Sequence, residues 1–301
     1  MRKAARMGTA ARLRIVPPIA PPDDTHSLEA QLARLQREQR ELHRALFEAA
    51  EVQRRLCPPR QLRHGRFEIA CEMFPLSYLS GDFYDVLDLG SATGLAVGDI
   101  VGKGLAAGMW FAHLLGQLRV QGRSSTDPAK VVAGINHDLR QLKAEPPLVS
   151  LFFARLDPKR GELAYCNAGQ PPALLLKADG STRPLAEGGP LLGAIPQAAF
   201  VSGRVSFEPG DTLVVYSDGI VECRNAAGDE FGLARLEAAV RYAAGLSRSS
   251  RAESREVAQS ATRDAPSANK LLFSLLGAVQ DFAGPTPRED DFALLVVPSL
   301  D

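Results

Sequence analysis

The stretch from Gly94 to Arg119 places the strongest limits on how this chain can fold. Residues 95–97 predict a short buried strand, residues 98–104 a tight loop that carries Asp99, and residues 105–119 a helix with a wide apolar face. Gly102 and Gly104 allow backbone angles that are closed to other residues, so the main chain can fold closely around whatever Asp99 binds. An acidic side chain is therefore held where a strand passes into a helix.

This loop lacks the spacing of the common nucleotide-binding motifs. The dinucleotide pattern G-x-G-x-x-G is absent, and Lys103 is followed by Gly104 where a P-loop requires Ser or Thr. A carboxylate at the mouth of a phosphate-binding loop repels its ligand unless a cation lies between them. The pattern favours a metal site and leaves a nucleotide-binding enzyme as a weaker alternative.

Composition excludes several classes of protein. The 301 residues include 35 basic and 35 acidic side chains and are 45% hydrophobic, which is typical of a globular chain without the basic excess of a nucleic-acid-binding protein. No secretory signal and no run of about eighteen apolar residues occurs, so we expect a cytoplasmic protein without a membrane segment. The four cysteines form no C-x-x-C pair, so neither a zinc site nor a redox motif is indicated.

Two segments precede the main domain. Residues 1–26 are basic and then rich in proline, which predicts a disordered arm. Residues 27–57 predict a coiled-coil helix that forms a homodimer, because leucines, with a few Ala and Gln residues, recur at alternating spacings of four and three and form one seam. Its positions are Leu28, Leu32, Leu35, Gln39, Leu42, Leu46, Ala49, Gln53 and Leu56. The alternative is a single amphipathic helix that packs on its own domain.

Residues 58–301 predict one α+β domain. Strand candidates at 66–74, 81–89 and 94–99 precede helices at 105–119 and 128–143. A succession of strands over 148–180 indicates an antiparallel meander, and residues 203–225 indicate a hairpin and a further strand. Helices at 231–244 and 268–282 precede a last strand at 292–297. Strands linked by hairpins and paired helices favour a layered α+β fold over a doubly wound parallel sheet.

Acidic residues recur at the predicted strand ends, each beside glycine or a second acid. They are Asp82 in SGDFYD, Asp99 in VGDIVGKG, Asp218 in YSDGIVE, and Asp290 with Asp291 in EDDFALLVV. Each alone is more often a turn or cap residue. If the strand ends meet, divalent cations make several ionised carboxylates tolerable, and oxygen ligands favour Mg²⁺ or Mn²⁺. Two such ions could activate one water for displacement at phosphorus.

Five successive motifs resemble the SpoIIE/RsbU-type branch of the PPM (protein phosphatase 2C-like) metal-dependent serine/threonine phosphatases. They are LSGDFYDV, GDIVGKGLAAGM, RLDPKRGELAYCNAGQPPALLL, YSDGIVECRNAAGDEFG and DDFALLVV, within a similarity that covers about residues 45–298. The resemblance implies two stacked antiparallel β-sheets flanked by helices, preceded here by the coiled-coil helix. It also implies a PPM-type phosphatase domain over residues 58–301.

The resemblance further implies a site and a substrate. Two Mn²⁺ or Mg²⁺ ions would be held by Asp82, Asp99, the carbonyl of Ile100, Asp218, and Asp290 or Asp291, with Asp290 preferred. The substrate would be a phosphoserine or phosphothreonine on a regulatory partner of the anti-sigma-factor antagonist type.

Two positions depart from the family pattern. Gln170 stands where the family often has His, and Val101 where it often has Ser. The five histidines lie outside the motifs, so no histidine general acid is evident. A catalytically weak partner-switching scaffold, or pseudophosphatase, is therefore the alternative function. Lys103 is either a solvated loop residue or a partner for substrate phosphate.

Overall fold

The computed structural model describes residues 25–142, 145–246 and 266–300, so residues 1–24 of the predicted arm lie outside it. The chain divides into two compact units, residues 1–45 and 46–301. In the described ranges, no helix has both the length and the apolar character that a bilayer crossing requires.

The first unit contains most of the predicted coiled-coil segment. Helix α1 (Thr25–Leu56) begins two residues before the predicted start and continues into the second unit. Its leucines at 28, 32, 35 and 42 are 53–61% exposed. The helix is therefore present with an exposed apolar row, whereas its pairing with a second copy stays a prediction.

The second unit contains two β-sheets. The first has the strand order β1-β2-β12-β11-β7-β8. Its strands are β1 (Gln61–His64), β2 (Phe67–Phe74), β7 (Ala173–Leu176), β8 (Thr182–Leu185), β11 (Thr212–Tyr216) and β12 (Phe292–Pro298). All of its neighbours pair antiparallel.

The second sheet has the order β10-β6-β5-β4-β3, with β9 also paired to β6. Its strands are β3 (Phe83–Asp88), β4 (Thr93–Ile100), β5 (Val149–Asp157), β6 (Glu162–Ala168), β9 (Gly188–Gly189) and β10 (Gly203–Ser206). The short β6–β9 pair is parallel, and the others are antiparallel.

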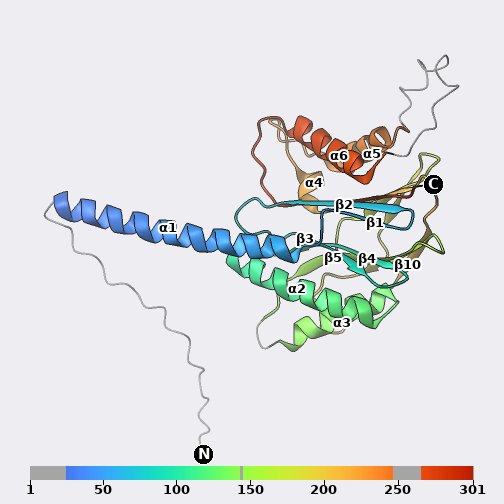
Figure 1. Ribbon diagram of the computed structural model, residues 1–301, viewed down its shortest axis with the longest axis horizontal. Helices are drawn as coiled ribbons and strands as arrows, with labels where there is room; N and C mark the ends of the chain where they lie inside the picture. Colours follow the sequence, from blue (N-terminus) through green and yellow to red (C-terminus); the bar gives the residue numbers. More distant parts are fainter. Residues whose placement is uncertain (1–24, 143–144, 247–265, 301) are drawn as a thin grey trace, which may run out of the picture. The chain divides into compact units, whose positions relative to one another are not determined.

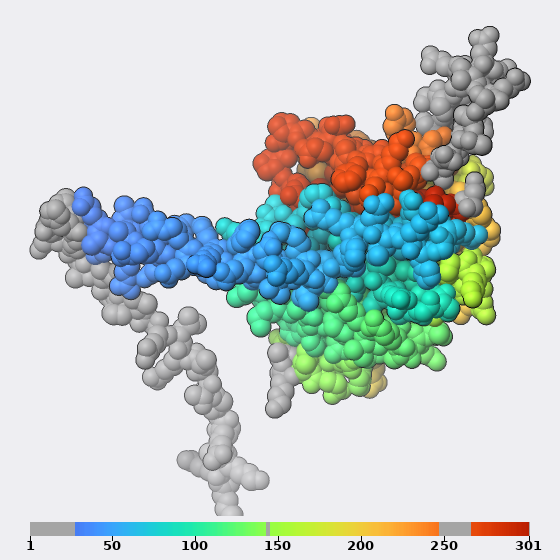
Figure 2. All heavy atoms as spheres, viewed as in Figure 1, coloured from blue at the N-terminus to red at the C-terminus, as the bar shows by residue number. Residues whose placement is uncertain are grey.

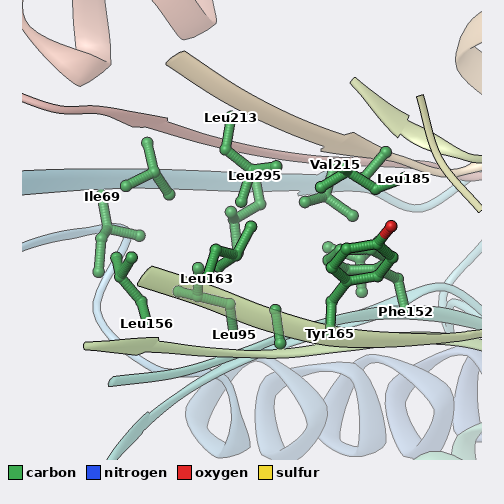
Figure 3. Packing of buried hydrophobic residues seen from close by; sticks show 14 of the residues in the cluster. Ile69, Leu95, Phe152, Leu156, Leu163, Tyr165, Leu185, Leu213, Val215 and Leu295 are labelled. Atoms are coloured by element: carbon green, nitrogen blue, oxygen red, sulfur yellow. The ribbon is translucent and has the colours of Figure 1, made fainter. Parts of the chain in front are cut away.

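The sheets stack face to face, and helices cover their outer faces (Figure 1). Alternate residues of each strand face inward, so Leu213 and Leu295 of the first sheet meet Leu95 and Leu163 of the second (Figure 3). The other face of the first sheet packs on α5 (Gly232–Ala243) and α6 (Ala268–Ala283). The other face of the second packs on α2 (Leu105–Ser124) and α3 (Pro128–Gln141).

Both central sheets are thereby buried on two sides, which explains why strands such as β12 are apolar at every position. Figure 2 shows the two helical layers above and below the strands on the face viewed. The predicted α+β class and the stacked sheets are confirmed.

Four local predictions are wrong. Residues 203–206 and 212–216 do not form a hairpin, because β10 pairs with β6 while β11 joins the other sheet. The segment after β11 forms a short helix, α4 (Asp218–Glu222), where a strand was expected. The meander ends at β6, since β7 crosses to the first sheet. Asp99 also lies within β4 rather than in the following loop.

The last turns of α1 differ from the predicted seam. Gln53 is 4% exposed, and its Nε2 donates to the Ser80 carbonyl at 2.8 Å while its Oε1 accepts from the Ser80 N–H at 3.0 Å. Leu56 is partly buried and packs against the hydrophobic cluster that α2 and α3 cover. This part of α1 therefore behaves as the alternative predicted, a helix that packs on its own domain.

Candidate metal centre

The predicted acids lie at one end of the sandwich because antiparallel pairing places the end of one strand beside the start of the next. Asp99 near the end of β4 lies beside the start of β3, where Asp82 precedes Phe83. Asp218 follows the end of β11, beside the start of β12, which Asp290 and Asp291 precede. Each sheet thus contributes acids to the same end.

Direct backbone contacts join these segments. The Ile100 N–H donates to the Gly81 carbonyl at 3.2 Å, and a Cβ on residue 81 would lie 2.8 Å from the Ile100 oxygen and 3.0 Å from Asp99 Oδ1. A Cβ on residue 219 would lie 2.2 Å from the Asp291 carbonyl oxygen. Only glycine permits these approaches, so Gly81 and Gly219 bring the acidic segments together.

Asp82 is the acid whose position is hardest to explain as structural. It is 2% exposed, and its Oδ2 is buried without a hydrogen-bond partner. Burial raises the pKa of this carboxyl well above its ordinary value, a hydrogen bond from Ser217 opposes that shift, and Asp99, Asp291 and Asp218 add to it. A buried oxygen without a partner beside three further acids is the environment that a cation would relieve.

Asp99 lies in the same field and is half-buried. Burial raises its pKa to about 6, with further increases from Asp218, Asp290 and Asp291. The influence of these acids extends to Glu222 on α4, whose pKa is raised by burial and by the carboxylates of Asp218, Glu230 and Asp290. The acids of the centre therefore oppose one another's ionisation.

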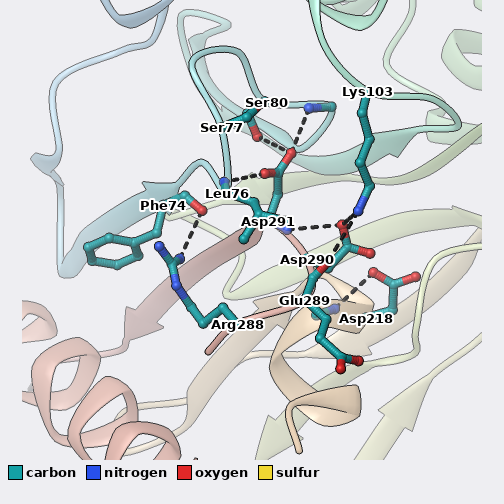
Figure 4. A network of polar contacts seen from close by, with 12 residues as sticks. Phe74, Leu76, Ser77, Ser80, Lys103, Asp218, Arg288, Glu289, Asp290 and Asp291 are labelled. Carbon is teal, nitrogen blue, oxygen red and sulfur yellow. Dashed lines mark hydrogen bonds and ion pairs between the residues drawn. The ribbon is translucent and has the colours of Figure 1, made fainter. Parts of the chain in front are cut away.

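Adjacent Asp290 and Asp291 make different contacts (Figure 4). Asp291 is buried, and its oxygens accept from the Leu76 N–H at 2.6 Å, the Ser80 hydroxyl at 2.9 Å and the Gly81 N–H at 2.8 Å. Asp290 is exposed, and its Oδ1 lies 3.0 Å from the Lys103 ammonium. Asp291 thus holds the 76–81 loop by hydrogen bonds, whereas Asp290 forms an exposed ion pair with Lys103.

The acids lie in one region but do not yet surround one position for a metal ion. Within the described ranges, no three acidic, histidine or cysteine side chains are arranged around a position suited to an ion. This agrees with the contacts of Asp290 and Asp291, which turn toward Lys103 and the 76–81 loop. The donor set, carboxylates with the nearby Ile100 carbonyl, is of the kind that a hard divalent cation prefers.

Gln170 connects the two halves of the centre. It is buried; its Oε1 accepts from the hydroxyl of Ser150, the cross-strand neighbour of Asp99. Its Nε2 donates to the Tyr216 carbonyl at 3.0 Å, two residues before Asp218. Gln170 therefore fixes the strand ends that carry Asp99 and Asp218, which is an orienting role by hydrogen bonds.

Sequence reasoning missed two neighbouring groups. Ser217 is fully buried, and its Oγ accepts from the Ala293 N–H at 2.9 Å, which ties β11 to β12 beneath the acids. Arg119 donates to Asp85 at 2.8 and 3.2 Å and to the Leu56 carbonyl at 2.6 Å. The acid of that pair lies in the SGDFYD motif, but nothing in the sequence links it to Arg119, 34 residues later on α2.

A surface hollow of about 280 Å³ opens beside Asp290. It lies between α4 and the segment before β12, and residues of both charges line it, including Glu222, Arg224 and Glu289. Of the candidate acids, only Asp290 lines this hollow.

Two stacked sheets with outer helices and acids gathered at one end define the PP2C-like class of fold. The SiaA-PP2C domain of Pseudomonas aeruginosa has this fold, with a TM-score of 0.71 and 19% identity over 88% of this chain and 99% of that chain. The catalytic domain of the serine/threonine phosphatase PstP, solved with two manganese ions, gives 0.51 and 14% over 78% and 99%.

The chain belongs to the Stage II sporulation protein E (SpoIIE) family, whose model matches residues 90–298. It is 24% identical over 191 residues to the phosphoserine phosphatase RsbU of Bacillus subtilis, which is 63% of this chain and 57% of that protein. It spans 31% of protein IcfG of Synechocystis sp., with 26% identity over 57% of this chain. The resemblance to the SpoIIE/RsbU branch is confirmed, and the chain spans less than two thirds of these relatives.

Proposed function

We propose that this chain is a metal-dependent protein serine/threonine phosphatase. The observation that carries the proposal is the buried, unpartnered Oδ2 of Asp82 among three further acids. A site for two Mn²⁺ or Mg²⁺ ions would use Asp82, Asp99, the Ile100 carbonyl, Asp218 and Asp290. RsbU, which is named a phosphoserine phosphatase, and PstP, solved with two manganese ions, support this assignment.

Within the pair at the start of β12, we assign Asp290 as the ligand. Both oxygens of Asp291 already accept hydrogen bonds from the 76–81 loop, so turning it inward would leave those donors unpaired. Asp290 would give up only an exposed ion pair. Asp291 then acts by holding Ser80 and Gly81 in place beside Asp82.

The chemistry follows from this arrangement. When bound, two divalent ions supply a Lewis-acidic pair that lowers the pKa of a water molecule and polarises a phosphoester. The protein's own contribution is to hold carboxylates from both sheets in fixed positions, through Gly81, Gly219 and Gln170. Such positioning is what displacement at phosphorus requires of a protein.

The substrate we propose is a phosphoserine or phosphothreonine on a regulatory partner protein of the anti-sigma-factor antagonist type. The hollow beside Asp290 is open at the surface, so a side chain presented by another folded protein can reach it. The similarity to RsbU supports a phosphorylated protein as substrate.

The test is phosphate release by the Asp218→Ala variant in the presence of Mn²⁺. We expect loss of turnover by at least ~100-fold with an unchanged fold, because a ligand is removed. Asp281→Ala, on an exposed position of α6, is the matched control and should retain activity. Metal-dependent turnover by the Asp218→Ala variant contradicts the assignment, and no turnover by folded, metal-loaded wild type supports the partner-switching scaffold.

We also propose that α1 forms a homodimeric coiled coil over residues 28–45. Four exposed leucines recur along this segment at intervals of four, three and seven, as in an a/d seam. Gln53 and Leu56 belong to the domain contact instead. The proposed seam is therefore shorter than the segment 27–57.

A further inference from the structure

Lys103 occupies a defined position at the rim of the acidic centre. Its Nζ lies 3.0 Å from Asp290 Oδ1 and 3.2 Å from the Glu289 carbonyl oxygen. The loop that carries it has Gly102 at φ 125° and Gly104 at φ 77°, which other residues rarely adopt. The Val101 N–H also donates to the Leu148 carbonyl at 2.9 Å. The backbone of Lys103 is thus fixed, and its exposed side chain reaches Asp290 (Figure 4).

The ion pair with Asp290 is easily exchanged. Its two side chains are 59% and 50% exposed, and such pairs contribute about 0–1 kcal/mol. A divalent cation at the same carboxylate gains more, since it carries twice the charge and approaches the oxygens directly. The inference rests on the proposed function, in which Asp290 is a ligand: metal binding must then take Asp290 from Lys103.

The net charge of the metal-bound acidic centre indicates what the Lys103 ammonium would contact after it leaves Asp290. The five aspartates, when ionised, exceed the charge of two divalent cations by one, so the centre would repel a phosphoryl dianion. A further cation beside the metals removes this barrier. A lysine ammonium offers three donors and a compact charge, which suits phosphate oxygens.

The arginines that line the hollow beside Asp290 are engaged elsewhere. Arg288 donates to the Phe74 carbonyl at 3.1 Å and lies over the rings of Phe74 and Phe292. Arg224 pairs with Glu230 at 2.7 Å. Lys103, by contrast, contacts the segment that carries Asp290, through the Asp290 carboxylate and the Glu289 carbonyl oxygen.

We propose that Lys103 is a phosphate-binding side chain, held on Asp290 in the metal-free protein and released to the substrate phosphoryl group when metal occupies the centre. Lys103 therefore opposes the binding of metal and favours the binding of phosphate. These two effects have opposite signs, which separates this role from a merely structural one.

The experiment compares Lys103→Met and Lys103→Arg with the wild-type chain and with Lys159→Met, a control on an exposed turn. Titration calorimetry with MnCl₂ alone should show roughly twofold to fivefold tighter binding by Lys103→Met, because Asp290 no longer has a competing cation. Inorganic phosphate should bind the Mn²⁺-loaded Lys103→Met variant about tenfold more weakly, whereas Lys103→Arg retains most of the affinity. The Lys159→Met variant should match wild type in both titrations.

Two results would overturn the proposal: unchanged affinity for Mn²⁺ in Lys103→Met, or unchanged affinity for phosphate. Both readouts are binding measurements and need no turnover. If wild type binds Mn²⁺ yet releases no phosphate from any phosphoprotein, the proposed function fails while the exchange at Lys103 is still decided by calorimetry.

Discussion

Asp82 and Asp85 lie three residues apart in one motif and have opposite environments. Both are almost fully buried, at 2% and 1% exposure, and burial raises the pKa of each carboxyl. Arg119 opposes that shift at Asp85 through a two-point ion pair, whereas at Asp82 three further acids increase it. Burial of an acid therefore says little about function, and the absence of a compensating cation says much more.

The strand geometry explains the difference. Asp85 is on the face of β3 that carries Phe83 and Leu87 and packs against α2, where Arg119 lies. Asp82 precedes the strand, at the end of the sandwich where both sheets contribute acids. An odd spacing along an extended chain directs two side chains to opposite sides. One motif thus supplies an acid to the centre and another to the packing of a helix.

Exchanging each acid for its amide should separate these roles most strongly. Asp82→Asn should lower Mn²⁺-dependent phosphate release by at least ~100-fold and leave the melting temperature equal or higher, since a buried charge without a partner is removed. Asp85→Asn should retain metal binding and melt at a lower temperature. Phosphate release and thermal unfolding, measured on both proteins, check this. If Asp85→Asn loses more activity than Asp82→Asn, the comparison is wrong.

Removing the cation of the structural pair should give the next largest effect. Arg119→Met leaves the buried Asp85 unpaired and should lower the free energy of unfolding by about 2–4 kcal/mol, measured by urea denaturation. Lys130→Met, on an exposed position of α3, is the control and should change stability little. The double variant Asp85→Asn/Arg119→Met should lose less than the two single losses added. Additive losses would show that the two side chains do not act as a pair.

The sequence predicted the layered fold because strand periodicity and glycine turns are local signals. It also placed Asp82, Asp99 and Asp218 at strand ends, and antiparallel pairing then brings such ends together. The path between the sheets was not predictable: β10 and β11 are separated by a short turn yet join different sheets, which depends on inward-facing residues far apart in the chain. The Arg119 pair and the bridge made by Gln170 are contacts of the same non-local kind.

Acidity at the centre should give the metal-free protein an unusual dependence on pH. The pKa of Asp99 is raised to about 6, so the folded chain keeps a proton that the unfolded chain loses near pH 4. The stability contributed by this group is present at low pH and is lost as the pH rises from about 4 through about 6. Urea denaturation with a chelator at pH 4.5 and 7 should show this loss, and Asp99→Asn should reduce it. If the Asp99→Asn variant loses as much stability between pH 4.5 and 7 as wild type does, Asp99 is not the group responsible. Asp281→Asn is the control and should behave as wild type.

The smallest effect on the acidic centre should come from the exposed seam of α1. Leu35→Glu with Leu42→Glu should convert a dimer to a monomer, because charges at these positions disfavour an a/d interface. Phosphate release measured on a small phosphoester should change by less than about twofold, since these residues lie outside the unit that holds the acids. Light scattering measures the oligomeric state, with Glu38→Gln, off the seam, as control. A monomeric wild type would remove the proposed coiled coil.

Gly219 has a consequence for how this protein can change over time. Because a Cβ there would lie 2.2 Å from the Asp291 carbonyl oxygen, even alanine would force β12 away from the turn after β11. Asp218 and Asp290, separated by 72 positions in the chain, would then move apart together with their strands. The spacing of two candidate ligands thus depends on a residue with no side chain, and variation there would reach the chemistry without altering a single charged group.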